Sequence, residues 1–364
     1  MKVKIERTAL IAGLQMVQNV VSLRSTLPIL YNVLIRADKD SLFLTTTDLD
    51  MSVRCQVKAE VEKAGATTLP ARRLFNIVRE LGDSHVELKL EDNNSTSVSC
   101  GSSFFKIMGM ADEDFPPMPE AGDSAAYRLE QAAFKEMLRK THYAASTEET
   151  RYILNGVLLS FREGKLTMVA TDGRRLALVE QEIEFPKEAE ADMVLPSKAV
   201  NELLHTLGGE GELSIRAEKN RAMFEYNNVA MSTKLIEGSY PNYRQVIPPE
   251  CEERIAVDRE SLLLALRRVS LVTTDKSNAT KLTFAKNKLV VTTTTPDVGE
   301  ARESVPIKYS GKQIAVAFNP EYVMDPLKNL SNDELYFELT DDLSPGVVKC
   351  DMPFLYVLMP IRIT

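Results

Sequence analysis

Residue types that could carry out chemistry are present, but their spacing does not assemble a metal or redox site. The cysteines Cys55, Cys100, Cys251 and Cys350 are scattered and form no Cys-x-x-Cys pair, and the three histidines are equally isolated. Zinc ligands cluster at short spacings, so we expect no metal and no cofactor. Thiols without a pairing pattern fit a reducing cytoplasm.

Two aspartates, Asp48 and Asp172, could be taken for a catalytic carboxylate pair. Each follows an apolar strand and a threonine, where aspartate is a common turn residue, so we interpret both as turn residues. The glycine-rich run 208–211 lacks the Lys and Ser/Thr of a phosphate-binding loop, and the chain has neither a GxGxxG turn nor a GxSxG elbow. The sequence therefore predicts no catalytic site, with an unrecognised spatial site as the alternative.

The elements around these aspartates occur three times, with a period of about 125 residues. LPILYNVLIRADKDSLFLTTTDLDMSV matches RYILNGVLLSFREGKLTMVATDGRRLALV, and NATKLTFAKNKLVVTTTTPDVGEAR is a weaker third copy. A strand running into a helix follows each copy, at Pro70, Pro196 and Pro320, and proline is favoured at a helix start. Landmarks in one order at one period predict three domains, at 1–125, 126–251 and 252–364.

The fold class that we expect is α+β. Apolar residues recur at helical spacing, as at Leu10, Leu14, Val17 and Val21, whereas SLFLTTT and HVELKLED alternate as strands with one solvated face do. Each copy thus predicts two helices packed on antiparallel sheets. The predicted helices are 7–22, 71–80, 130–146, 197–207, 258–272 and 320–330.

The charge of the chain is unevenly distributed. The formal net charge is −8, which argues against a protein coated with positive charge, yet the predicted helices together are net positive. This excess indicates either ordinary helix solvation or a shared surface that faces a polyanion such as DNA. The basic residues of such a surface are Arg7, Arg24, Arg72, Arg73, Arg79, Arg139, Lys140, Arg267 and Arg268.

No segment predicts a membrane anchor. The longest apolar stretch runs only from Pro353 to Ile361, far short of the ~20 residues that span a bilayer. The start, MKVKIERTAL, has no apolar segment of the kind found in secretory signals. We expect a cytoplasmic protein with no membrane partner.

Together these motifs resemble the bacterial sliding clamp family, the beta subunit of DNA polymerase III. The resemblance covers the whole chain and is carried by LPIL near residue 30, ATDGRRLA at 170–177, SYPNYRQVIP at 239–248 and the terminal VLMPIR. It implies a head-to-tail homodimer whose domains close a ring, with helices lining the hole and sheets outside. Such a ring encircles duplex DNA without reading its sequence and tethers the replicative polymerase.

The resemblance also implies a pocket between the second and third domains for a short linear peptide with an apolar end. Arg174 stands where many relatives have His, and Gln245 where some have Arg. The implied pocket residues are Leu154, Thr171, Gly173, Arg174, Arg175, Leu176, Pro241, Gln245, Val246, Asn319, Tyr322, Val357, Met359, Pro360, Ile361 and Arg362.

For DNA, the resemblance points to Arg24, Arg72, Glu148, Tyr152 and Ile153. Glu148 departs from the family pattern, and its carboxylate should repel phosphate. For the dimer contact, the resemblance implies that Phe105 and Ile107 of the first domain pack on Leu271 and Val272 of the third. Because Ser102 and Phe104 stand where some relatives have basic residues, we hypothesise a more apolar and less salt-sensitive interface.

The implied partners are double-stranded DNA, a second copy of the chain, the DNA polymerase III alpha subunit and the clamp loader delta subunit. Other polymerases, ligase and mismatch-repair proteins would bind through short linear peptides. The alternative from a different class is a peptide-binding hub that keeps the pocket but does not close around DNA; a monomeric mass in solution would favour it.

Overall fold

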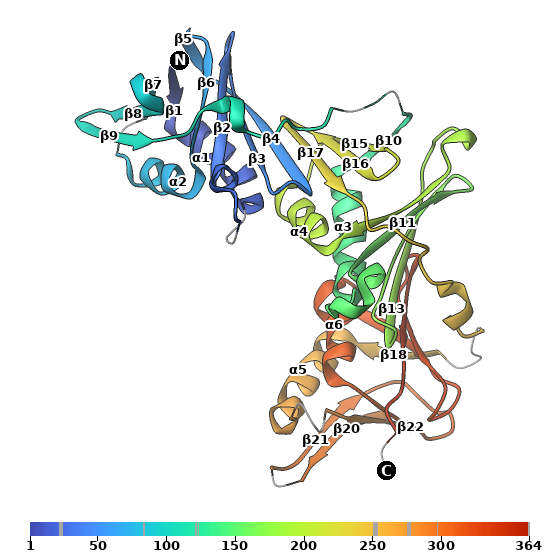
Figure 1. The fold of residues 1–364 in the computed structure, drawn as a ribbon. Coiled ribbons are helices and arrows are strands. Elements are labelled where there is room, and N and C mark those ends of the chain that lie inside the picture. The colour runs from blue at the N-terminus through green and yellow to red at the C-terminus, as the bar shows by residue number, and fades with distance from the viewer. Residues whose placement is uncertain are drawn as a thin grey trace. The chain divides into compact units, whose positions relative to one another are not determined.

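The structure is a computed structural model that describes residues 1–21, 25–82, 84–120, 122, 124–249, 254–274, 278–296 and 298–362. The chain divides into two compact units, each built from two stretches of sequence (Figure 1). The first unit is Met1–Phe134 with Asn201–Leu235, and the second is Lys135–Val200 with Ile236–Thr364.

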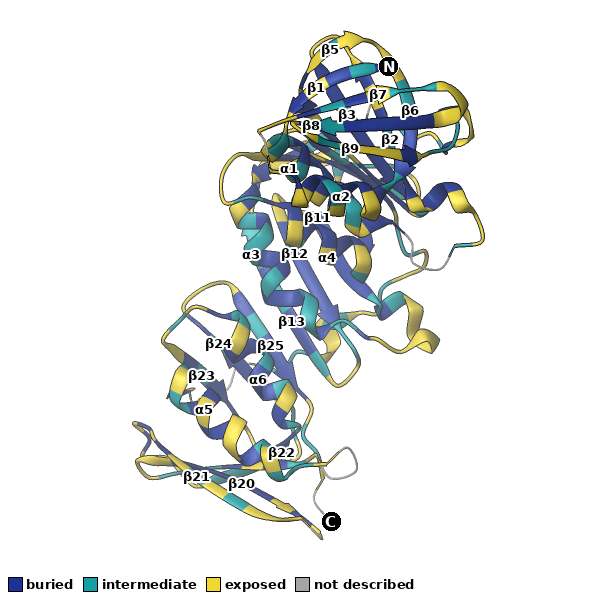
Figure 2. Ribbon diagram, turned by 90° about the vertical axis from the view of Figure 1, so that its left-hand side faces the viewer, coloured by how far each residue is buried: buried dark blue, intermediate teal, exposed yellow. Residues whose placement is uncertain are grey.

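The described part of the chain contains six α-helices, at the positions that the sequence predicts. Three of them continue into a short 3-10 turn, namely η1 (Gln18–Val20), η5 (His142–Ala144) and η9 (Ser270–Val272). Each α-helix shows buried and exposed residues on different sides, as amphipathic periodicity requires (Figure 2). The α-helices are α1 (Arg7–Val17), α2 (Ala71–Glu80), α3 (Gln131–Thr141), α4 (Ser197–Thr206), α5 (Arg259–Val269) and α6 (Pro320–Asn329).

The first unit contains two antiparallel sheets. A five-stranded sheet has the order β5 (Glu60–Lys63), β1 (Lys2–Glu6), β7 (His85–Leu90), β8 (Ser95–Cys100) and β9 (Ser103–Met108). An eight-stranded sheet has the order β10 (Ala126–Glu130), β15 (Glu212–Ala217), β16 (Arg221–Tyr226), β17 (Val229–Lys234), β4 (Met51–Lys58), β3 (Ser41–Thr47), β2 (Asn32–Asp38) and β6 (Gly65–Pro70).

The second unit contains an eight-stranded and a four-stranded sheet, both antiparallel. The larger has the order β14 (Ala191–Pro196), β11 (Gly156–Arg162), β12 (Lys165–Thr171), β13 (Arg175–Glu182), β25 (Phe354–Leu358), β24 (Gly346–Lys349), β23 (Glu334–Glu338) and β18 (Arg254–Asp258). The smaller has the order β21 (Gly299–Pro306), β20 (Lys288–Thr295), β19 (Thr280–Ala285) and β22 (Ile314–Phe318).

A short strand that the sequence analysis did not anticipate precedes the first helix of each copy. These strands are β1, β10 and β18, and each has five residues. Their apolar residues alternate and are buried, for example Val3 and Ile5 in β1. The alternation was visible in the sequence, but five residues are too few to distinguish a strand from the start of the adjoining helix.

Each eight-stranded sheet joins strands of two successive copies at one seam. Strand β4 of the first copy pairs with β17 of the second, and β13 of the second pairs with β25 of the third, so the repeats are fused edge to edge. Among the described strands, β9 and β21 occupy the corresponding positions in the first and third copies, and each lies at a sheet edge. One seam position is therefore open on each terminal copy.

Candidate functional site

The loop that connects β12 to β13 is built around Asp172. Its carboxylate oxygen Oδ1 accepts hydrogen bonds from the backbone N–H groups of Arg174 (2.9 Å) and Arg175 (3.0 Å), which closes a tight turn. Gly173 lies within the turn at φ +84°, in the left-handed region where glycine has no steric penalty. Asp172 is therefore a turn residue, as its position after a strand and a threonine predicts.

The loop is tied to the C-terminal end of the chain by backbone contacts. Leu176 pairs with Val357 in the β13–β25 seam. The Met359 N–H donates a 2.9 Å hydrogen bond to the Arg174 carbonyl oxygen. The loop 171–176 and the segment 357–359, which are far apart in the sequence, thus lie side by side and face a common space.

A mostly apolar hollow of about 150 Å³ lies between these two segments, within the second unit. Its floor includes Leu176 and Val357, which are buried in a cluster with Leu158, Val169 and Val194. Such a hollow suits apolar side chains, and the flexible Met359 adapts to different ones. The lining residues are Leu154, Thr171, Gly173, Arg174, Arg175, Leu176, Pro241, Asn242, Tyr243, Val246, Val357 and Met359.

The hollow therefore brings together most, but not all, of the residues expected from the sequence. Asn242 and Tyr243 were not expected, although they lie inside the motif SYPNYRQVIP that supplied Pro241 and Val246. Asn319 caps α6, because its side-chain Oδ1 accepts a 2.9 Å hydrogen bond from the Glu321 N–H. The expected residues that do not line the hollow are Gln245, Asn319, Tyr322, Pro360, Ile361 and Arg362.

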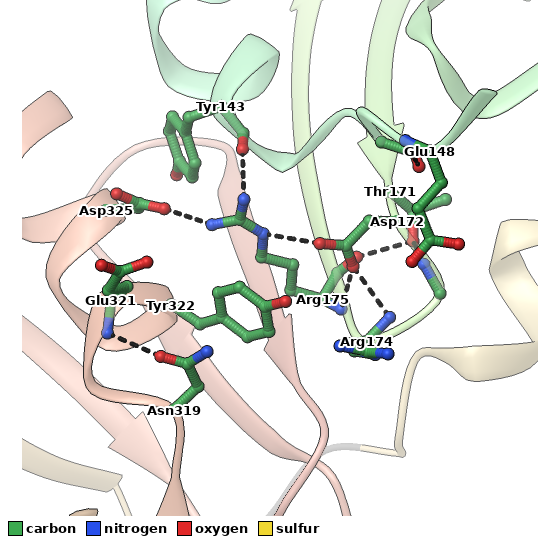
Figure 3. Close-up of polar contacts among 12 residues, drawn as sticks. Tyr143, Glu148, Thr171, Asp172, Arg174, Arg175, Asn319, Glu321, Tyr322 and Asp325 are labelled. Atoms are coloured by element: carbon green, nitrogen blue, oxygen red, sulfur yellow. Dashed lines mark hydrogen bonds and ion pairs between the residues drawn. The ribbon is translucent and has the colours of Figure 1, made fainter. Parts of the chain in front are cut away.

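Arg175 extends from the hollow into a polar network (Figure 3). Its Nε donates to Asp172 Oδ2 (3.1 Å), its Nη2 donates to the Tyr143 carbonyl oxygen (2.6 Å), and its Nη1 donates to Asp325 Oδ2. The guanidinium also lies over the Tyr322 ring, 4.3 Å from the ring centroid. The side chains of Arg175, Asp172 and Asp325 are only 11%, 15% and 22% exposed, so solvent screens these contacts poorly.

The network keeps Arg175 charged. Burial alone would lower the pKa of Arg175, but the carboxylates of Asp325 and Asp172 raise it, and the net shift is upward. Burial raises the pKa of the Tyr143 and Tyr356 phenols, so both stay neutral. The network therefore holds the Arg175 cation between two carboxylates, Asp172 and Asp325.

The residues expected to contact DNA differ in exposure and in their ion-pair partners. Arg24 lies outside the described residues, whereas Arg72 is exposed on α2. Glu148 forms an ion pair with Arg151 (3.3 Å), so its carboxylate has a cationic neighbour. Tyr152 is 60% exposed, but Ile153 is half-buried and packs on the cluster beneath the hollow.

The basic surface inferred from helix charge is smaller than the sequence suggested. Lys140 does not belong to it, because its side chain is only 3% exposed and its Nζ lies 3.3 Å from Glu136. Arg139 also pairs with Glu136, and Arg268 pairs with Glu303. The two pairs with Glu136 have helical spacing and could have been expected from the sequence, whereas the Arg268–Glu303 pair joins positions far apart in the chain. Arg72, Arg73 and Arg267 are exposed and form no ion pair with another residue that the structure describes.

The residues expected at the dimer contact also differ in exposure. Phe105 is 39% and Leu271 is 82% exposed, and Val272 is half-buried. Ile107 is only 3% exposed, because its side chain points to the core side of β9. It therefore supports the strand rather than presenting a free surface. On β9 the structure exposes instead Phe104 (66%) and Met108 (61%), which the sequence analysis had not singled out for contact.

Asp48 and Cys55, two residues whose types could carry out chemistry, lie in a turn and in the core, respectively. Asp48 is a turn residue like Asp172, accepting hydrogen bonds from the Asp50 and Met51 N–H groups. Burial raises the pKa of the Cys55 thiol to about 11, which disfavours the nucleophilic thiolate. The described residues contain no group of three or more His, Cys, Asp or Glu that could hold a metal ion. No helix among them is long and apolar enough to cross a membrane.

The fold and the hollow define a class of protein: three tandem α+β domains joined edge to edge, with an apolar hollow beside one seam. Profiles of the DNA polymerase III beta subunit match all three copies, the N-terminal domain at residues 1–119, the central domain at 128–242 and the C-terminal domain at 244–362. The chain belongs to this family, the bacterial sliding clamps, which are processivity factors of DNA replication.

Individual relatives agree with this assignment over the full chain. The chain is 34% identical to the beta sliding clamp of Chlamydia trachomatis, covering all of this chain and 87% of the relative. It is 33% identical to that of Caulobacter vibrioides, covering all of both chains. The fold matches a sliding clamp from Bartonella birtlesii bound to griselimycin with a TM-score of 0.95 at 34% identity, and the clamp of Bacillus subtilis with 0.94 at 27%, each over the whole of both chains.

Proposed function

We propose that two copies of the chain close head to tail into a ring around duplex DNA and tether the replicative polymerase to it. The observation that carries this proposal is the repeated seam. Two seams inside the chain join one copy to the next through β4–β17 and β13–β25. The strands that correspond to these partners in the terminal copies, β9 and β21, lie at sheet edges. A second chain can complete both positions, and a head-to-tail contact closes when the rotation completes a circle.

The internal seams predict the register of the intermolecular one. Strands β4, β13 and β21 each have eight residues, and β9 and β17 each have six, so they can be overlaid from their first residues. In the β4–β17 seam, Ser232 is paired with Ser52. The same register places Lys106 of β9 opposite Glu300 of β21 in the second chain, and both residues are exposed. This ion pair joins the apolar contact that we propose for Phe105, Leu271 and Val272.

We propose that DNA meets the exposed arginines of the helices through weak phosphate contacts that do not depend on sequence. Arg72 and Arg73 on α2 and Arg267 on α5 are available because they form no ion pair with another described residue. Loose electrostatic contacts permit sliding. Processivity in this proposal comes from the closed ring rather than from tight binding. Tyr152 is exposed and can add an apolar contact, whereas Glu148 is directed to Arg151.

The hollow beside the β13–β25 seam is the proposed docking site for short linear peptides. Its apolar lining suits leucine and phenylalanine side chains. Arg174, exposed on the rim, can meet an acidic residue of the peptide. The proposed partners are the polymerase III alpha subunit, the clamp loader delta subunit, other polymerases, ligase and mismatch-repair proteins. We propose a cytoplasmic location and no catalytic activity of the chain itself.

The topology of the DNA complex tests this function. The protein is loaded onto a nicked circular plasmid with a bacterial clamp loader and ATP, and the complex is isolated by gel filtration. The plasmid is then cut once and the sample is filtered again. Retention on the circle and loss from the linear DNA is the expected result, because a ring slides off an end. Equal retention on both forms would refute encirclement and favour a hub that binds peptides without closing on DNA.

A further inference from the structure

Asp325 lies on α6 and does not line the hollow, yet it binds a residue that does. We infer that Asp325 is a positioning residue of the peptide pocket: it holds Arg175 from α6 and thereby fixes the loop 171–176 that forms one wall. This inference rests on the proposal that the hollow binds peptides. The inference goes beyond that proposal because it makes the shape of the pocket wall depend on a carboxylate that lies outside the pocket.

The geometry connects three separate segments through one guanidinium. Arg175 donates to Asp172 in its own loop, to the Tyr143 carbonyl oxygen in η5, and to Asp325 in α6. Tyr322, one turn before Asp325, covers the face of the guanidinium. The Tyr322 carbonyl oxygen accepts a 2.9 Å hydrogen bond from the Tyr356 hydroxyl, and Tyr356 lies in β25 at the seam. The loop is therefore braced against both α6 and the seam.

The first copy of the repeat shows that the turn does not need this arginine. At the position of Arg175 the first copy has Met51, whose N–H donates a 2.7 Å hydrogen bond to Asp48 Oδ1. Met51 begins β4, which forms its own seam with β17. Turn and seam thus form with an apolar side chain at this position. The second copy differs in that the hollow lies beside its turn. The Arg175 guanidinium and the Asp325 carboxylate therefore serve the hollow rather than the turn or the seam.

The network also determines which of the two arginines, Arg174 or Arg175, can form an ion pair with a bound peptide. Two carboxylates already neutralise Arg175, and its side chain is only 11% exposed. An acidic residue of a peptide would have to displace Asp172 or Asp325 to reach it. Arg174 is exposed and its guanidinium forms no ion pair with another residue in the described part of the chain. Arg175 therefore shapes the wall, whereas Arg174 is the cation open to the peptide.

The test compares Asp325→Asn with Glu321→Gln, which makes the same change of charge one turn earlier on α6 at an exposed position. The full-length protein is titrated against a fluorescein-labelled seven-residue peptide ending in Leu-Phe, and anisotropy gives the dissociation constant. Because loss of a poorly solvated charged hydrogen bond frees the loop, we expect Asp325→Asn to weaken peptide binding about tenfold. Glu321→Gln should bind like the parent, and Asp325→Glu, which retains the charge, should recover most of the affinity.

A double-mutant cycle separates positioning from general destabilisation. In an Arg175→Met background, which copies the residue of the first repeat, Asp325→Asn should have no further effect on peptide binding. An equal loss in both backgrounds would show that Asp325 does not act through Arg175 and would overturn the inference. Parent-like affinity of Asp325→Asn, with Met359→Ala weakened, would overturn it while leaving the proposed function intact. If the parent itself bound no peptide, the proposed function would fail first.

Discussion

Truncation of Met359 to alanine should weaken peptide binding without disturbing the fold. Met359 lines the hollow and is 43% exposed in the free protein. Full burial of a methionine side chain is worth about 1.5–3 kcal/mol, so covering the exposed part contributes about 1 kcal/mol. Vacant space left in the pocket adds to the loss. We expect the dissociation constant of a Leu-Phe peptide to rise about five- to tenfold.

The local backbone supports this interpretation of the substitution. The Met359 N–H is hydrogen-bonded to the Arg174 carbonyl oxygen, and this contact does not depend on the side chain. The dimer mass and the melting temperature should therefore stay at the parent values. Anisotropy titration measures the affinity, and sedimentation measures the mass.

Met352→Ala provides the matched control. Met352 is 37% exposed and does not line the hollow, so its truncation removes a similar exposed side chain away from the proposed site. Equal peptide affinity of Met359→Ala and the parent would remove Met359 from the binding site. An equal loss of peptide affinity in Met352→Ala would show that the effect is not specific to the hollow. That result would refute the assignment of the hollow as the peptide site.

Three other predictions follow from the described contacts. Gly156→Ala should lower the free energy of unfolding by about 2–3 kcal/mol, because the new Cβ would lie 2.1 Å from the Leu195 carbonyl oxygen and push β11 from β14. Burial lowers the pKa of His142 from its ordinary value of 6.5, so the unfolded chain binds the proton first as the pH falls. The free energy of unfolding should therefore decrease below about pH 6.5. Denaturant titrations between about pH 7.5 and 5.5 should show that His142→Gln flattens this dependence. Lys106→Glu and Glu300→Lys should each weaken the dimer severalfold, and the double exchange should restore it, as measured by sedimentation at low salt.

Each of these predictions has an outcome that contradicts it. A Cβ added at Gly209 would meet no atom within 4 Å, and this glycine has no positive φ, so Gly209→Ala serves as the control; equal stability of the two alanine variants would remove the steric argument. Parallel pH slopes for His142→Gln and the parent would show that another group titrates. Failure of the double exchange to restore the dimer would mean that the register carried over from the internal seams is wrong.

The sequence by itself determined the three-fold repetition and the helices. Local periodicity encodes these features, and each landmark occurs more than once, so the pattern exceeds chance. All six α-helices begin within a residue of the predicted start. The turn at Asp172 was equally predictable, because an aspartate after a strand bonds to the backbone next to it. The short strands β1, β10 and β18 escaped notice because five alternating residues carry little signal.

Only the tertiary structure decided which side chains are available and which residues share a site. Lys140 and Ile107 are buried. The Lys140 Nζ lies 3.9 Å from the Met352 sulfur, 212 residues farther along the chain, and such a contact leaves no periodic trace in the sequence. The bracing of Arg175 by Asp325 joins positions 150 residues apart. The pairing of β13 with β25 likewise brings the loop at Gly173 against the end of the chain at Met359. Local propensity acts over a few residues, whereas the pocket depends on long-range packing that only the folded chain establishes.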